Sequence, residues 1–177
     1  MIIRVVASVL VIVGVFLAYA ALKSGDYVIS RELAIHAPAE KVFPYLNNSK
    51  LAGEWMPWAE ADPTVKMSYS GPAEGVGSRS SWDSPGQMGT GSATVVESVP
   101  NRSVHTKLEY VKPFQMQQDA ELSIRPADAG NVIVTWSVKG TNTFMGRVMC
   151  SFMNMDKMVG GSFEKGLSNL KTRMEKI

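Results

Sequence analysis

A run of glycines between Ser68 and Glu97 raises the possibility of a phosphate-binding loop. A dinucleotide-binding loop requires G-x-G-x-x-G at the start of a helix, and a P-loop requires a Lys-Ser or Lys-Thr pair after its last glycine. The segments GVGSRS and GQMGTGSAT match neither pattern, and the residues around them, RSSW and SATVVESV, favour strands. We therefore expect these glycines to form turns and flexible strand ends of an antiparallel sheet.

The other potentially reactive side chains are isolated. Cys150 is the only cysteine, which excludes an internal disulfide and a paired-cysteine zinc site, and its surroundings, RVMCSFMNM, favour a small buried residue over a nucleophile. Strand alternation places His105 on the solvent face. His36 ends a strand beside Pro38, which favours a structural or exposed role. The sequence therefore predicts no metal and no cofactor.

Charge and length limit the classes of function. The 18 basic and 16 acidic residues are interleaved, and the formal net charge is +2. Without a basic block, nothing indicates a nucleic-acid partner. A chain of 177 residues has room for one domain of ordinary size and an appendage.

The predicted appendage is the uncharged apolar run from Val5 to Leu22, bounded by Arg4 and Lys23. It is long enough to cross a hydrocarbon core of roughly 30 Å. The alternative is a signal peptide cleaved after Ala18-Tyr19-Ala20, which would leave a secreted or periplasmic protein. We favour an uncleaved single-pass anchor over residues 1–25, because the apolar run continues past that site. The flanking charges do not decide which side of the membrane the domain faces.

Residues 26–177 are expected to form one domain. YVISRELAIHA is a strand with Tyr27, Ile29, Leu33 and Ile35 on one face, and a short helix follows it. NSKLAGEWMPWAEADP is a second short helix that breaks into a loop at Pro57. Six further strands are expected, in TVKMSYS, GSRSSWD, GSATVVESV, SVHTKLEYV, QMQQDAELSIR and NVIVTWSVKG. The short connections between them require antiparallel pairing.

A long amphipathic helix closes the chain. From Ser162 to Ile177, apolar residues recur at helical spacing. Gly160 and Gly161 are expected to mark a break before this helix. Gly166 lies inside it, at a cost of about 1 kcal/mol relative to alanine, which a close approach between helix and sheet would offset.

The order of elements and several motifs resemble a known family. IHAPAEKVFPYLNN, WMPWAEADPTVKMSYSGPAEGVGSRSSW, VIVTWSVKG and MDKMVGGSFEKGLSNLKTRME are similar to the polyketide cyclase/dehydrase branch of the START-like (SRPBCC) superfamily, in particular to its membrane-anchored bacterial members. The resemblance covers roughly residues 27–176. It implies an α+β helix-grip fold of the Bet v 1 type, in which a curved seven-stranded antiparallel sheet wraps around the C-terminal helix. It also implies a cavity between the two and a location at the bacterial inner membrane.

The glycine run then has a structural explanation. Gly86, Gly89 and Gly91 would let a strand curl around the helix, and Gly75 and Gly77 would turn one strand into the next.

Alternation and helical spacing select side chains expected to line the implied cavity. These are Trp55, Trp58, Trp82, Thr106, Leu108, Tyr110, Gln118, Leu122, Trp136, Phe144, Met149, Phe163 and Leu167.

Three functions are compatible with these residues. The first is binding of a hydrophobic small molecule or lipid by a monomer, because an apolar concave site needs only a few polar groups. The second is a cyclase or dehydratase, for which the inner face offers weak proton donors or acceptors: Tyr110, Thr106, Gln118 and Arg31. The third is a packed core without a ligand. We favour binding, because few titratable groups are expected to face inward.

Overall fold

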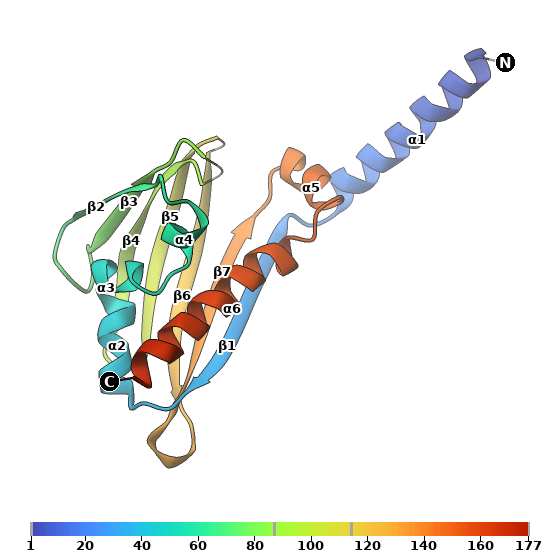
Figure 1. Cartoon of the computed structure of the whole chain (residues 1–177). Coiled ribbons are helices and arrows are strands. Elements are labelled where there is room, and N and C mark those ends of the chain that lie inside the picture. Colours follow the sequence, from blue (N-terminus) through green and yellow to red (C-terminus); the bar gives the residue numbers. More distant parts are fainter. Residues whose placement is uncertain (1, 87, 114, 177) are drawn as a thin grey trace.

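The computed structural model describes residues 2–86, 88–113 and 115–176 (Figure 1). Seven antiparallel strands form one sheet in the order β1-β7-β6-β5-β4-β3-β2. The strands are β1 (Asp26–Ile35), β2 (Lys66–Ser70), β3 (Arg79–Asp83), β4 (Thr90–Val99), β5 (Ser103–Lys112), β6 (Met116–Pro126) and β7 (Val132–Thr141). The helices are α1 (Ile2–Leu22), α2 (Ala39–Asn47), α3 (Ser49–Gly53), α4 (Trp58–Ala61), α5 (Phe144–Cys150) and α6 (Met155–Met174), with a short 3-10 turn at Asp128–Gly130. The predicted α+β helix-grip fold is confirmed.

Helix α6 runs across one face of the sheet beside β1 and β7, and α1 projects away from the domain (Figure 1). The predicted alternation in β1 is confirmed, since Ile29 and Ile35 are buried on the inner face while Glu32 is exposed on the other. Leu167 and Leu170 of α6 are buried in the same core. The core therefore lies between α6 and the part of the sheet nearest β1.

A helix break is present in this segment, but it comes before Pro57, and a helix rather than the expected loop follows the proline. Helix α3 already ends at Gly53, and Pro57 is the N-cap of α4, which begins at Trp58. Because a proline lacks an N–H, it fits the start of a helix better than its interior.

The expected helix break at Gly160 and Gly161 is wrong. Helix α6 starts at Met155, where the Asn154 side chain accepts a hydrogen bond from the Lys157 backbone N–H at 2.9 Å. Both glycines lie inside the helix. A Cβ on Gly160 would clash with the guanidinium of Arg31, so this glycine makes room for a side chain from β1.

The close approach expected at Gly166 is confirmed. A Cβ built there would lie 2.8 Å from Cζ3 of Trp136 and 3.2 Å from Cδ of Pro57. The helix therefore meets the sheet and the segment before α4 at a point where a methyl group does not fit.

Two alanine substitutions in α6 should have opposite effects on stability. Gly161 is exposed and nothing lies near its Cβ position, so Gly161→Ala should raise the free energy of unfolding by up to about 1 kcal/mol through helix propensity. Gly166→Ala should lower it by about 1–3 kcal/mol, because Trp136 must move. Denaturant unfolding of the full chain in detergent measures both, and equal stability of the two variants would contradict the packing assigned to Gly166.

Gly75 and Gly77 lie in the connection between β2 and β3, where the sequence predicts a turn, and Gly89 directly precedes β4. Gly75, Gly77 and Gly89 have φ angles of 76°, 88° and 61°. At Gly89 a Cβ would also clash with the backbone carbonyl of Lys112. The register of β4 against β5 shifts between Thr90 and Gly91 and again between Val95 and Glu97, and irregularities of this β-bulge kind bend a strand.

Helix α1 has the length and composition of a membrane span. Its segment Arg4–Leu22 has a mean hydropathy of 2.7 and is almost entirely exposed. A signal sequence fits the same description.

Candidate functional site

The centre of the interface between sheet and α6 is filled by aromatic side chains. Trp136 of β7 stacks on Phe163 of α6 with ring centroids 4.2 Å apart and an interplanar angle of 12°. Trp55 and Trp58 meet Trp136 edge-on at 5.4 and 5.9 Å. The indole N–H of Trp55 donates a hydrogen bond to the Tyr45 carbonyl at 2.9 Å. This half of the inner face is packed core.

The inner face is less completely covered at the end of β3 to β6 that holds Trp82 and Tyr110, whereas Val95, Val104, Leu122 and Ile124 on the same strands are buried in the core. Trp82, Leu108 and Tyr110 lie there and are half-buried, and Trp82 meets Tyr110 edge-on at 5.3 Å. Gly91 lies beneath Trp82, because a Cβ at that position would clash with the indole. Here the sheet presents aromatic and aliphatic surface that α6 does not seal.

Polar groups are concentrated at one end of this half-buried region. The side-chain amide of Gln118 donates a hydrogen bond to the phenol oxygen of Tyr27. Burial raises the pKa of Tyr110 to about 12, and the neighbouring Tyr27 adds to the rise. Burial also raises the pKa of Tyr27, an effect that the Gln118 hydrogen bond partly offsets. Both phenols are therefore neutral at physiological pH and are available as hydrogen-bond donors rather than as proton acceptors.

A hollow of about 550 Å³ adjoins this polar end. It lies where the end of α1, the start of β1, α5 and the α5–α6 connection meet, and Tyr27 and Ile29 belong to its lining. Arg147 also lines it and has no ion-pair partner among the described residues. The volume falls within the range of about 300–1,000 Å³ that is usual for ligand sites.

The structure divides the expected cavity residues into three groups. Trp55, Trp58, Leu122, Trp136, Phe163 and Leu167 belong to the packed core or lie against it. A second group lies on the half-buried inner face: Trp82, Thr106, Leu108, Tyr110 and Gln118, of which Leu108 also packs against the core. Phe144 and Met149 are exposed on α5.

Strand alternation places Tyr27 on the inner face, but Tyr27 is not among the site residues expected from the sequence. No sequence pattern points to Arg147. Alternation in β1 could have identified Tyr27. Arg147 lines the hollow only because α5 packs beside α1, and no local sequence pattern encodes that packing.

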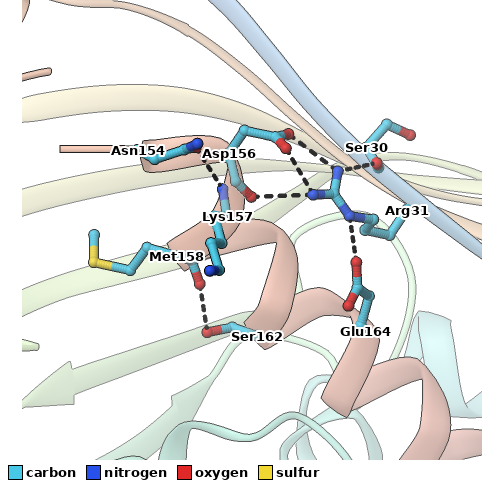
Figure 2. Close-up of polar contacts among 8 residues, drawn as sticks. All are labelled: Ser30, Arg31, Asn154, Asp156, Lys157, Met158, Ser162 and Glu164. Atoms are coloured by element: carbon cyan, nitrogen blue, oxygen red, sulfur yellow. Dashed lines mark hydrogen bonds and ion pairs between the residues drawn. The ribbon is translucent and has the colours of Figure 1, made fainter. Parts of the chain in front are cut away.

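Arg31 is engaged in ion pairs and is not a free proton donor (Figure 2). Its Nη2 lies 2.8 Å from Oδ2 of Asp156, and its Nε lies 2.7 Å from Oε1 of Glu164. Nη1 also donates to the Ser30 carbonyl at 2.8 Å. Hydrogen bonds to Asp156 and then to Glu164 raise the pKa of Arg31 above its already high ordinary value. We therefore correct its expected role as a weak proton donor or acceptor of the cavity. Arg31 instead joins α6 to β1.

This ion pair should make the fold sensitive to acid. The hydrogen bond from Arg31 lowers the pKa of Asp156, so the contribution of this carboxylate to stability is present at neutral pH and is lost as the pH falls through the lowered pKa. Asp156→Asn should therefore melt at a lower temperature than the unmodified chain at pH 7, with a difference that disappears in acid. Thermal melts between pH 7 and pH 3 measure this, with Glu97→Gln on the exposed side of β4 as the control. A difference independent of pH would contradict it.

The two histidines and the cysteine form no catalytic arrangement in the described part of the chain. His36 is exposed and its Nδ1 lies 2.6 Å from a carboxylate oxygen of Glu175, while His105 lies on the outer face 3.6 Å from Glu121. Cys150 is half-buried on α5, so it is less enclosed than expected. Within the described residues, no group of three or more His, Cys, Asp or Glu side chains is arranged to hold a metal ion.

Comparison with known families gives one match that covers most of the chain. Residues 28–175 match the profile of the family described as polyketide cyclase/dehydrase and lipid transport. A search of curated protein sequences finds no significant match.

Solved structures with the same fold share little sequence with this chain. A point mutant of norcoclaurine synthase from Thalictrum flavum, in complex with a transition-state analogue, aligns with a TM-score of 0.67 and 10% identity over 88% of this chain and 98% of its own. The Aha1 dimer from Colwellia psychrerythraea aligns with a TM-score of 0.56 and 18% identity, over 84% of this chain and 96% of its own. The di-domain ARO/CYC protein StfQ of the steffimycin pathway aligns with a TM-score of 0.60 and 12% identity, over 85% of this chain and 51% of its own. At these identities the comparisons show the fold alone.

Proposed function

The chain belongs to the polyketide cyclase/dehydrase and lipid transport family, and on that premise we propose that it binds a hydrophobic small molecule or lipid without converting it. The observation that carries the proposal is the half-buried inner face of β3 to β6, where Trp82, Leu108 and Tyr110 offer apolar surface. The phenols beside it are neutral, and Arg31 is occupied by ion pairs. Such a face is suited to holding an apolar molecule, and the side chains placed on it, Trp82, Thr106, Leu108, Tyr110 and Gln118, include no carboxylate or imidazole that could act as a general base.

The proposed binding site extends from this face into the hollow beside α1. Tyr27 and Gln118 lie at the join between the two and would fix the orientation of a polar group on the ligand. Helix α1, as an uncleaved span, would hold the domain next to a reservoir of apolar molecules.

Mass spectrometry of molecules that copurify with the full chain in mild detergent tests this function directly. We expect an apolar species that is recovered unchanged after incubation with fresh protein, and that displaces a fluorescent fatty-acid probe. If no apolar species copurifies and the probe does not bind, the packed-core alternative is the better account. A species returned dehydrated or cyclised would favour an enzyme.

One observation supports the enzymatic alternative. Two neutral phenols, Tyr27 and Tyr110, lie near each other with Gln118, and such donors stabilise negative charge that develops on a carbonyl oxygen. If the chain is an enzyme of this kind, Tyr110→Phe should lower kcat by about 10²–10³-fold. The same variant should weaken ligand binding by no more than about tenfold, the effect of one hydrogen bond. Equal losses in turnover and affinity would indicate that Tyr110 serves binding alone.

The monomeric state remains a prediction. One structural neighbour, Aha1, is described as a dimer, so the shared fold does not favour a monomer. Light scattering of the detergent-solubilised chain measures the state, and a molar mass of twice the 19.3 kDa chain after detergent correction would contradict the prediction.

A further inference from the structure

We propose that α5 and its connection to α6 form a second membrane-contacting surface, which docks into the boundary between lipid headgroups and acyl chains beside the end of α1. This inference rests on the proposed span by α1. It assigns the bilayer as the partner of a surface that adjoins the proposed ligand site.

The surface consists of large apolar side chains that the fold leaves in solvent. We call it the α5 apolar surface, and its members, 41–77% exposed, are Phe144, Met145, Met149, Phe152 and Met153. These side chains lie within ten residues of the chain, between positions 144 and 153, and clustered exposed apolar side chains of this size mark an interaction site on a soluble surface. Flexible methionines together with phenylalanines suit a fluid partner without a fixed shape.

This surface is joined to the apolar helix. The ring of Phe152 lies 5.4 Å from the ring of Phe16 in α1. Arg147 of α5 donates hydrogen bonds to the backbone carbonyls of Ala21 and Lys23, at 3.1 and 2.6 Å, and so ties α5 to the last turn of α1. Figure 1 shows α5 next to the end of α1 from which the domain begins.

The position of Phe16 sets the depth of its partner. Arg4–Leu22 is about 28 Å long as a helix, which matches the hydrocarbon core of a bilayer. Phe16 precedes Leu22 by six residues and lies about 9 Å from the end of the span. When α1 spans the bilayer, Phe152, which lies beside Phe16, therefore reaches below the headgroups. Its depth is then within the range of about 5–10 Å at which interfacial helices lie.

Docking of this surface would bring the hollow to the lipid. The hollow is lined by α5 and the α5–α6 connection as well as by β1, and Phe152 and Met153 belong to both the hollow and the α5 apolar surface. An apolar ligand would then pass between bilayer and domain without crossing water.

Fluorescence depth measurements on the full chain in phosphatidylcholine/phosphatidylglycerol vesicles test the proposal. Cys150→Ser removes the single cysteine, and NBD is then attached at one new cysteine: Phe152→Cys on the surface, Val13→Cys in α1, or Ser168→Cys on the exposed side of α6. We expect blue-shifted emission at positions 13 and 152, with quenching by nitroxides on the lipid acyl chains. At position 168 we expect quenching by aqueous iodide only.

The three labels separate failure of the proposal from failure of its premise. Acyl-chain quenching at 13 combined with strong iodide quenching at 152 would leave α1 as a span and overturn the docking surface. Protection of 152 from both quenchers would mean that protein covers it, which also overturns the proposal. Iodide quenching at both 13 and 152 would refute the span and the docking together, while copurification of a ligand would remain a separate measure of the proposed function.

Discussion

Trp136→Ala is expected to lower the free energy of unfolding by about 3–5 kcal/mol, the usual cost of removing a packed tryptophan. Trp136 is 4% exposed and stacks on Phe163, and Trp55 and Trp58 meet its edges. It also fills the space that Gly166 leaves open on α6. Its removal would leave a cavity at the point where sheet, α4 segment and helix meet. Denaturant titration of the full chain in detergent measures the loss.

Trp82→Ala is the matched control for this prediction. Trp82 is half-buried and has one aromatic partner, Tyr110, so the same truncation should cost clearly less stability. Its ligand affinity should nevertheless fall, because Trp82 lies on the face proposed to bind the ligand. Equal destabilisation by the two variants would mean that the β3–β6 face is as tightly packed as the centre, and would argue against a binding site there.

The sheet and its inner face could be predicted because strand alternation is a local property. The side chain at every second position of β1 or β7 must share a face, so Ile29, Val134 and Trp136 were placed correctly without knowledge of the partner strands. The same holds for the turn at Gly75 and Gly77, because a short connection between two predicted strands indicates it.

The start of α6 could not be predicted in the same way. Two adjacent glycines normally weaken a helix, and here Gly160 makes room for the side chain of Arg31, a residue far away in the sequence, while nothing lies near the Cβ position of Gly161. The ion pairs of Arg31 with Asp156 and Glu164 have the same origin, because they require α6 to lie along β1.

The candidate site was predicted only in part for a related reason. Alternation selects the residues that face inward, but it does not say which of them the helices cover. Helix α6 lies mainly along β1, so Trp136 is sealed while Leu108 and Tyr110 remain half-buried. For Phe144 and Met149, apolar character indicated a cavity, yet α5 turns them to the surface beside α1.

Ala93→Trp should reduce ligand affinity by at least about 100-fold, or about 2.8 kcal/mol, if the β3–β6 face is the binding site. Ala93 lies on the inner face between Ser80 of β3 and Leu108 of β5, and it is half-buried. An indole at this position would occupy the space above the face. Because α6 does not fill that space, the added volume should lower the free energy of unfolding by less than the roughly 1–3 kcal/mol that overpacking costs in a closed core.

Lys107→Trp provides the control for this substitution, since Lys107 precedes Leu108 on β5 and is exposed on the outer face. It adds an indole to the same sheet without entering the proposed site, so probe displacement should give an affinity close to that of the unmodified chain. Loss of affinity in Ala93→Trp with retained thermal stability would assign the ligand to the β3–β6 face. Unchanged affinity in a folded Ala93→Trp variant would instead place the ligand in the hollow beside α1, because Tyr27 and Arg147 there would be untouched by the substitution.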